Sequence, residues 1–493
     1  MNKFFANSAT SINTNKDRRQ FIARCFQLGL SSAALNSLAA LSLPFLPAPL
    51  SANDQTGRAH FPHHKPTAKR VIMLTMSGGP SQLELFDNKP GLQKLAGTEL
   101  PDSVRMGQRL TTMTSGQKQL VMPARVRFNR HGQSGTEIGE WLPHLGTVAD
   151  DICLIKSMTA DEINHAPAMT QFLTGNQLPG KPSLGAWASY GLGSMNRDLP
   201  DYLVLISRML RPSDQPLYDH YWGSGFLPTG HQGVKLRNSK DPVLYLRDPN
   251  GLPRTIRRDM LDGLGALNQQ HLAETGDPEI ETRIKQYEMA YRMQASVPDL
   301  NDLSNEPESV FAAYGPDSRR PGSYAANCIL ARRLAERDVR FIQLVHPDWD
   351  HHSRLTSWCT ARCRDTDQPT AALIKDLKQR GLLDDTLVIW GGEFGRGVAG
   401  QGKWDSPEAG RDHHPRCFTT WMAGGGIKPG ISYGATDDFS YNVVESPVHI
   451  RDFHATILYC LGINHERFTV RSQGLDQRLT GVESARVVRD ILK

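Results

Sequence analysis

The sequence is poor in cysteine, and beyond its first fifty residues it has no long apolar run. Only 7 of its 493 residues are Cys, which is too few for the disulfide framework that stabilises small secreted domains. No run after residue 50 approaches the ~20 apolar residues of a membrane helix. We therefore expect a globular protein with no stable membrane span once its N-terminal segment is removed.

An excess of charge of one sign is also lacking. The chain has 56 Lys and Arg against 51 Asp and Glu. It has no basic tract and no stripe of Lys and Arg interleaved with aromatic residues, which is the usual footprint of a nucleic-acid-binding surface. The sequence therefore gives no support to a nucleic-acid partner.

The first 52 residues have the composition of an export signal. Residues 16–52 run from a basic start through a mildly apolar Ala/Leu/Ser stretch to a small-residue end, which are the three regions of a signal peptide. Arg18 and Arg19, followed by Gln, Phe and Ile, resemble the twin-arginine consensus. We predict a twin-arginine-type signal peptide over residues 1–52, export by that machinery to the periplasm or the extracellular space, and a flexible leader over residues 53–69. A retained amphipathic helix or anchor is the alternative.

Short apolar runs that end in Gly-rich or polar loops recur along the rest of the chain. They lie at residues 70–76, 151–158, 202–207, 339–346 and 385–395. Between them, apolar residues at three- and four-residue spacings predict helices, as over 323–338 and 370–383. This alternation predicts an α/β fold with a large, mainly parallel sheet flanked by helices and functional loops at its strand ends. We expect one such domain over residues 70–490, in which residues 210–300 are an inserted or capping region.

Candidate metal ligands gather in four loops that follow predicted strands. These loops are "INHAPAM" (163–169), "HPDWDHHSR" (346–354), "GGEFGR" (391–396) and "GRDHHP" (410–415). Neutral imidazole together with carboxylate is the ligand mix that zinc and manganese prefer, and carboxylate-rich versions accept magnesium or calcium. One such loop would be weak evidence, because a lone loop histidine is more often a surface residue. Four of them predict a site for one or two divalent ions, with zinc, manganese, calcium and magnesium as candidates.

Six sequence blocks carry a resemblance to a known family. They are "LTMSGGPSQLELFDNKP", "NHAPAMTQFLTG", "WGSGFLPTGHQGV", "LARRLAERDVRFIQLVHPDWDHH", "WGGEFGR" and "GRDHHP". In order and spacing these blocks resemble the secreted bacterial proteins of the DUF1501 family, over about residues 70 to 490. That family is similar to the alkaline phosphatase and sulfatase superfamily. The resemblance therefore implies an alkaline phosphatase/sulfatase-like fold with metal bound at the strand ends.

The resemblance also implies roles for eight residues. The implied metal ligands are Asp350, His352, Glu393, Asp412 and His413. The implied catalytic residues are His165, as a general base or phosphoryl acceptor, and Arg396 and Arg411, either of which would clamp an anion.

One departure from the superfamily pattern affects the expected mechanism. Sulfatases carry a C/S-x-P-S-R-x-x-x-x-T-G block whose first residue becomes the nucleophile. When the block is aligned on Thr174 and Gly175, His165 stands at the nucleophile position and Met169 stands where the arginine would be. The usual Cys or Ser nucleophile is therefore absent from this block.

Three functions are compatible with these residues. The first is an exported metal-dependent hydrolase of phosphate or sulfate esters, small or on glycans, in which metal-activated water replaces the missing nucleophile. The second is a catalytically inactive protein of the same fold that binds metal or an anionic glycan. The third is a secreted assembly or surface protein in which the His-rich loops only stabilise the scaffold.

Overall fold

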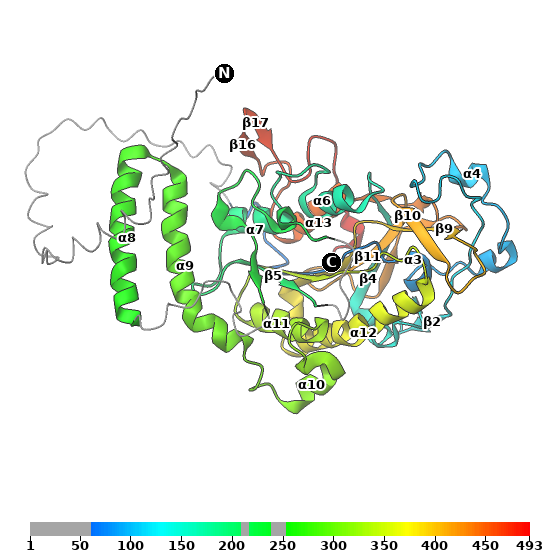
Figure 1. Cartoon of the computed structure of the whole chain (residues 1–493), viewed down its shortest axis with the longest axis horizontal. Coiled ribbons are helices and arrows are strands. Elements are labelled where there is room, and N and C mark those ends of the chain that lie inside the picture. The colour runs from blue at the N-terminus through cyan, green and yellow to red at the C-terminus, as the bar shows by residue number, and fades with distance from the viewer. Residues whose placement is uncertain (1–60, 209–215, 238–252) are drawn as a thin grey trace, which may run out of the picture. The chain divides into compact units, whose positions relative to one another are not determined.

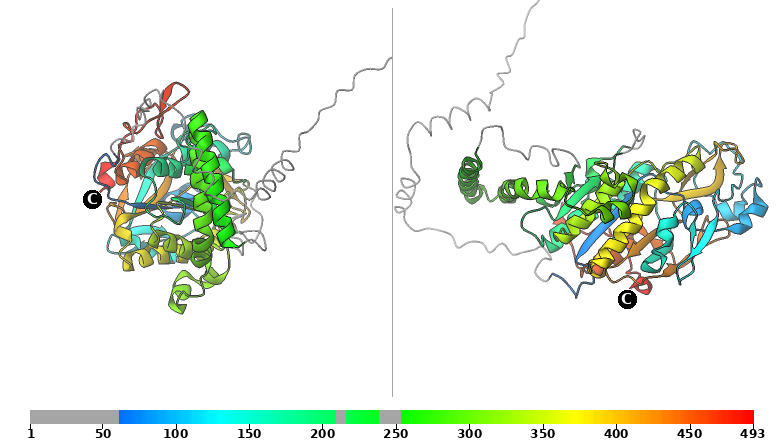
Figure 2. Two further views of the ribbon diagram at one scale, coloured as in Figure 1. Left: turned by 90° about the vertical axis from the view of Figure 1, so that its left-hand side faces the viewer. Right: turned by 90° about the horizontal axis from the view of Figure 1, so that it is seen from below.

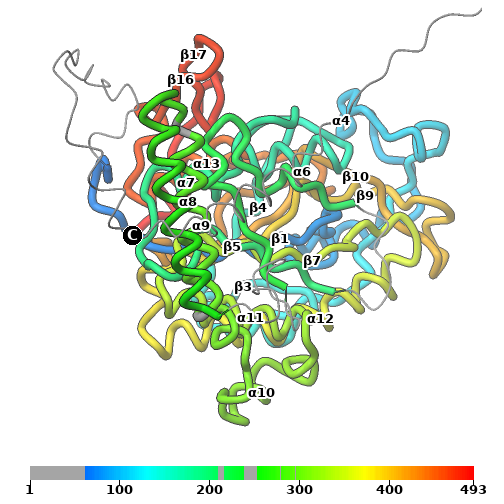
Figure 3. Tube along the Cα trace, turned by 60° about the vertical axis from the view of Figure 1, so that its left-hand side comes forward, coloured from blue at the N-terminus to red at the C-terminus, as the bar shows by residue number. Residues whose placement is uncertain are grey.

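A nine-stranded sheet forms the centre of the fold (Figures 1 and 3). The computed structural model describes residues 61–208, 216–237 and 253–493. The strands in spatial order are β12 (Ile431–Tyr433), β4 (Ile152–Thr159), β11 (Phe418–Ala423), β8 (Thr386–Gly391), β1 (Arg70–Met76), β7 (Phe341–His346), β5 (Tyr202–Ile206) and β6 (Val234–Leu236), and β15 (Val448–His449) also pairs with β4. Only β11 runs antiparallel to its neighbours. The predicted α/β class with a large, mainly parallel sheet is confirmed.

Helices cover both faces of this sheet, as Figures 1 and 3 show. One face carries α6 (His165–Thr174), α7 (Leu184–Leu192) and α13 (Ile450–Cys460), and the other carries α10 (Glu308–Tyr314), α11 (Tyr324–Glu336) and α12 (Leu355–Gln379). Every residue of β1, β7 and β8 is buried. Strands that are buried on both faces read as continuous apolar runs, which is why the sequence located these three strands well.

The register of the central strands places three loops at one edge of the sheet. Met76, the last residue of β1, pairs with His346, the last residue of β7. Thr75 pairs with Gly391, the last residue of β8. The loop after β8 continues into a two-stranded antiparallel ribbon of β9 (Gly395–Gln401) and β10 (Gly410–His414). The candidate ligand loops therefore meet at the carboxyl ends of parallel strands, where open α/β sheets bind ligands.

The remaining elements are short or peripheral. They are α3 (Gln82–Leu85), α4 (Asp102–Arg105), α5 (Pro143–Gly146), and the strand pairs β2 (Phe128–His131) with β3 (Thr136–Gly139), β13 (Ala435–Thr436) with β14 (Val443–Glu445), and β16 (Val470–Ser472) with β17 (Leu475–Gln477). In the described part of the chain, no helix combines the length and the apolar character needed to cross a membrane.

The predicted inserted region contains a long helical hairpin. It consists of α8 (Arg254–Thr275) and α9 (Pro278–Asn301), which lie antiparallel beside the sheet (Figures 1 and 2). Val297 and Leu300 near the end of α9 are fully buried and belong to the main core. The hairpin is therefore anchored to the domain through the end of its second helix.

The predicted leader differs from the structure where the two can be compared. Residues 61–69 pack against the domain: the ring of Phe61 contacts Phe468, and the backbone N–H groups of Thr67 and Ala68 both donate to the carbonyl of Cys460. An aromatic side chain that finds an apolar partner offsets the entropy cost of ordering the chain. The predicted signal segment, residues 1–52, lies outside the described residues.

Candidate metal centre

Three separate elements bring four possible ligands together. His165 is the first residue of α6, Asp350 and His352 follow β7, and His413 lies in β10. One ligand atom from each residue falls in a group in which all four atoms lie within 4.8 Å of one another. Side chains that are distant in sequence meet here because the segments after β4 and β7 and the ribbon strand β10 converge at one edge of the sheet.

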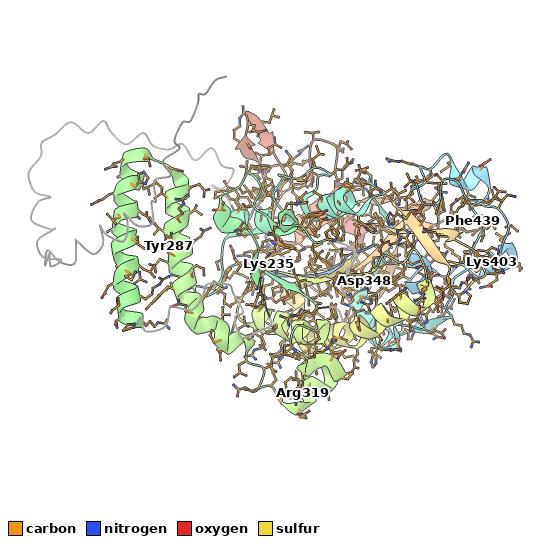
Figure 4. All side chains as sticks on the ribbon, in the orientation of Figure 1. Lys235, Tyr287, Arg319, Asp348, Lys403 and Phe439 are labelled. Atoms are coloured by element: carbon orange, nitrogen blue, oxygen red, sulfur yellow. The ribbon has the colours of Figure 1, made fainter. Side chains whose placement is uncertain are left out.

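A left-handed residue shapes the loop that supplies two of these ligands. Asp348 has a φ of 77°, a region that non-Gly residues rarely adopt. Its carboxylate lies 3.4 Å from the guanidinium of Arg362 on α12, and Figure 4 shows it between the sheet and that helix. Trp349, which is fully buried, donates its indole N–H to His346 Nδ1 at 3.0 Å. These contacts hold the chain on both sides of the turn that presents Asp350.

The imidazoles of His352 and His413 face each other through their Nε2 atoms, which are 2.9 Å apart. His413 Nδ1 lies 2.7 Å from the carbonyl oxygen of Ile163, and His352 Nδ1 lies 2.6 Å from Oε1 of Gln401. Oxygen can only accept in these bonds, so we assign a proton to each Nδ1. In that tautomer the two Nε2 lone pairs repel unless a cation lies between or beside them.

The carboxylate of Asp350 completes the group. Its Oδ1 lies 2.9 Å from His352 Nε2 and 3.3 Å from His413 Nε2. Burial opposes ionisation of Asp350, but the guanidinium of Arg396 and the surrounding histidines outweigh it and hold the pKa of Asp350 well below its usual range. Burial lowers the pKa of His413 well below its ordinary value, so this ring is neutral. Neutral imidazole and ionised carboxylate are the forms in which such side chains ligate a metal.

His165 and Glu393 form a bonded pair beside Asp350. Glu393 is fully buried, accepts from the backbone N–H of Gly78 at 3.0 Å, and lies 2.6 Å from His165 Nδ1. His165 Nε2 lies 3.2 Å from Asp350 Oδ2, yet among the described residues it has no partner with hydrogen-bond geometry. Burial lowers the pKa of His165, but the carboxylates of Asp350 and Glu393 outweigh this effect and raise it. Glu393, expected to be a ligand, therefore orients His165 from behind instead of joining the four-atom group.

The two arginines that were expected to clamp an anion are buried, and their guanidinium groups bond to oxygens of the protein. Arg396 is 1% exposed and donates to Asp350 Oδ1 at 2.6 Å. Arg411 is 0% exposed and pairs with the equally buried Glu84, with Nη2 2.7 Å from Oε1. Their donors point into the protein because β9 and β10 lie on the loop that follows β1. Neither guanidinium presents a free edge to a ligand at the metal group.

Asp412 also points away from the metal group. Its carboxylate accepts from the hydroxyl of Thr111, at 2.9 and 2.8 Å, and from that of Thr114. It also accepts from the backbone N–H of His413 at 2.8 Å. The carboxylate therefore fixes the loop near residue 111 to β10, and its neighbour His413 supplies the ligand atom.

Sequence reasoning missed the groups that orient the imidazoles. Gln401 is the last residue of β9 and belongs to no recognisable motif, and Ile163 contributes only its backbone carbonyl. Such outer contacts fix the tautomer and ring orientation of a ligating histidine. The pairing of β9 with β10 is the only feature that could have suggested Gln401, and that pairing is not visible in the residue pattern.

Comparison with known proteins identifies a family and a set of distant structures. A family model described as "Protein of unknown function (DUF1501)" matches residues 68–492. No curated relative matches the chain significantly.

The similar solved structures are distant. A phosphonate monoester hydrolase from Silicibacter pomeroyi is 12% identical with a TM-score of 0.35, covering 86% of this chain and 76% of its own. A sulfatase from Pseudoalteromonas sp. is 11% identical with a TM-score of 0.32, covering 81% and 68%. A mutant of TAB5 alkaline phosphatase is 13% identical with a TM-score of 0.32, covering 81% and 99%. At these identities and scores the likenesses do not define an activity for this chain.

Proposed function

The chain belongs to the DUF1501 family, and we propose that it is an exported, metal-dependent hydrolase of phosphate or sulfate esters. The observation that carries the proposal is the pair of Nε2 atoms of His352 and His413, 2.9 Å apart, beside the carboxylate of Asp350. If both rings are protonated on Nδ1, this arrangement is repulsive on its own and becomes favourable when a divalent cation accepts both lone pairs. The residues present therefore fit a metal ion.

We assign the ion to Asp350, His352 and His413. Two imidazoles and one carboxylate leave a coordination position open, which separates catalytic from structural zinc-type sites. When bound, a divalent cation lowers the pKa of a coordinated water toward ~7 and polarises an ester oxygen. Zinc or manganese suits this donor set better than magnesium or calcium, because two of the three donors are nitrogen.

His165 is assigned to proton transfer. Its Nδ1 is fixed by the carboxylate of Glu393 at 2.6 Å, and its Nε2 lies 3.2 Å from Asp350 Oδ2, beside the proposed ion. A histidine oriented by a buried carboxylate can hold a proton at Nε2 and exchange it with a reacting group. The arrangement would let His165 take a proton from the attacking water or return one to the leaving group.

Water is the proposed nucleophile because the described thiols are not suited to the role. The six cysteines among the described residues are all buried and unpaired. Burial raises the pKa of Cys417 well above its ordinary value and that of Cys153 to about 12. Thiolate is the reactive form of cysteine, so covalent catalysis by these residues is disfavoured.

A protein that binds metal without turnover is the second candidate. It is favoured by the position of His165, which offers one ring nitrogen within 4.8 Å of the other three ligand atoms. If His165 also ligates, the ion has four protein ligands, and a closed tetrahedral site is typical of a structural metal. The two candidates therefore differ in what His165 does.

Metal content and turnover of single variants test the proposal. The purified protein and its His352→Ala, His413→Ala and His165→Ala variants would be assayed for bound metal and for hydrolysis of aryl phosphate and aryl sulfate. We expect His352→Ala and His413→Ala to lose the ion and His165→Ala to keep it but lose turnover. His144→Ala, which changes an exposed histidine, should behave as the unchanged protein.

Two results would decide against the hydrolase. Loss of metal in His165→Ala together with an inactive parent protein favours the closed, binding site. A parent protein without metal, purified from metal-replete cells, contradicts both candidates.

Export rests on the sequence alone and has its own test. Replacing Arg18 and Arg19 by Lys should leave the protein in the cytoplasm, because the arginine pair is the part of the signal that the twin-arginine machinery reads. Fractionation of cells that express either form measures this. Equal export of both forms would contradict the assignment.

A further inference from the structure

The surroundings of Arg396 resemble a cation-binding cage. The guanidinium Nε donates to the carbonyl of Gly79 at 2.8 Å, and Nη1 donates to that of Arg411 at 3.1 Å. Nη2 donates to the carbonyl of Gly78 and to Asp350 Oδ1, and lies 3.4 Å from the carbonyl of Trp349. Four backbone oxygens and one carboxylate oxygen therefore surround one buried positive charge.

These oxygens come from the same strand ends that supply the metal ligands. Gly78 and Gly79 follow β1, Trp349 and Asp350 follow β7, and Arg411 lies in β10. Carbonyl and carboxylate oxygens are the ligands that hard divalent cations such as Ca²⁺ prefer. The cage thus has the donor chemistry of a second ion site, directly beside the first.

Arg396 is held rigidly in the cage. Its backbone N–H donates to Gln82 Oε1 at 2.8 Å, and its carbonyl accepts from Gln82 Nε2 at 2.8 Å. The whole residue is 1% exposed. A side chain fixed at its backbone and bonded through all three nitrogens cannot swing out to meet a substrate.

We propose that the guanidinium of Arg396 is a built-in second cation, so that the centre binds one metal ion and not two. This inference rests on the proposed metal centre but not on its turnover. The guanidinium shares Asp350 Oδ1 with His352 and His413, and so holds that oxygen in position next to the ion. A second divalent ion in the cage would have to displace a side chain that is hydrogen-bonded through all three of its nitrogens.

The proposal predicts the stoichiometry of the unchanged protein. Titration with Zn²⁺ or Mn²⁺, followed by removal of weakly bound metal and mass spectrometry under native conditions, should show one ion per chain. Excess metal, including Ca²⁺, should not add a second. Two tightly bound ions would overturn the proposal while leaving the hydrolase assignment intact.

Charge removal should convert the cage into a Ca²⁺ site. In Arg396→Gln the carboxylate and carbonyl oxygens lose their cation, so Ca²⁺ should bind as an additional ion and raise the melting temperature of the variant. Guanidinium ion at low concentration should also raise the melting temperature of Arg396→Gln, because it restores the missing group. Arg396→Lys keeps the positive charge and is the matched control, which should respond to neither.

The responses of the variants separate the possible explanations. A melting temperature of Arg396→Gln that is unchanged by both Ca²⁺ and guanidinium ion would show that the cage is only a structural contact, and would overturn the proposal. If Arg396→Gln is too unstable to purify without additions, recovery of folded protein in Ca²⁺ but not in Na⁺ is the expected result. Recovery in neither also counts against the proposal. None of these readouts requires the protein to hydrolyse an ester.

Discussion

The buried ion pair of Arg411 and Glu84 allows a quantitative test of how the strand-end loops are held. Arg411 Nε lies 3.1 and 3.0 Å from the two carboxylate oxygens of Glu84, and Nη2 lies 2.7 Å from Oε1. The other donors of Arg411 go to the carbonyls of Gly397, Val398 and Pro123. Both partners of the pair have 0% exposed side chains. The pair ties the loop after β1 to the strand that carries His413.

Neutralising one partner leaves the other charged and buried. For Glu84→Gln the expected loss is ~3–5 kcal/mol of unfolding free energy, because removal of one partner of a buried pair costs that much. At ~430 folded residues, roughly 1 °C of melting temperature corresponds to 1 kcal/mol, so we expect a decrease of about 3–5 °C. Arg411→Met should cost at least as much, because three carbonyls also lose their donor.

The double variant measures the coupling. In Glu84→Gln/Arg411→Met neither charge remains, so the loss should be smaller than the sum of the single losses by ~2 kcal/mol or more. Urea denaturation and thermal melting of the four proteins give this difference. Glu408→Gln is the surface control, because its pair with Arg354 is more than half exposed on both sides and should contribute at most ~1 kcal/mol.

The reasoning fails if Arg411 acts on a substrate. In that case Arg411→Met would melt like the parent protein and raise the KM for an anionic ester. Glu84→Gln would then have little effect on stability. Additive losses in the double variant would likewise show that the two side chains do not interact as the structure places them.

Three further predictions follow from single contacts. Asp412→Asn should retain the metal, because its carboxylate bonds Thr111, Thr114 and the backbone N–H of His413 and contributes no atom to the ion site, and loss of the ion on metal analysis would contradict this. Gln401→Leu should weaken metal affinity by ~10–100-fold in chelator competition by releasing His352 Nδ1, and an unchanged affinity would argue against an orienting role. Burial lowers the pKa of His454 from its ordinary 6.5 to about 4, so the unfolded chain takes up the proton first and stability should fall as pH drops from 6.5 to 4, by up to ~3 kcal/mol. His454→Gln should remove that part of the slope, and parallel pH profiles from urea denaturation would refute the assignment.

The fold could be predicted from the sequence better than the site. Burial of a strand produces a continuous apolar run, whereas a contact between two side chains leaves no such pattern. The apolar run over residues 70–76 coincides with β1 (Arg70–Met76), since a strand covered on both faces must be apolar throughout. The predicted helix over residues 370–383 overlaps only the C-terminal part of α12 (Leu355–Gln379) and runs past its end. Pro369 lies inside this helix, and the polar first half hides its periodicity. Amphipathic spacing therefore predicts the bounds of a helix less completely than a continuous apolar run predicts the bounds of a buried strand.

The ligand loops could be found from composition, but the role of each side chain could not. Asp350, His352 and His413 were expected as ligands and lie together with His165. Glu393 and Asp412 were expected beside them and instead bond to His165 and to Thr111. All of these residues have the chemistry to ligate. Which of them does so depends on side-chain direction, and direction is decided by strand register and not by residue type.

In residues 411–414, the strand register decides which side chain reaches the metal centre. In a regular strand, Arg411 and His413 would point to the same face. The pairing of β10 with β9 shifts between these two residues, and such an irregularity re-aims the side chains that follow it. Arg411 therefore reaches Glu84 while His413 reaches His352 and Asp350. Without the shift, one strand could not supply both a buried ion pair and a metal ligand two residues apart, so we regard this irregularity as the feature of β10 on which the metal centre depends.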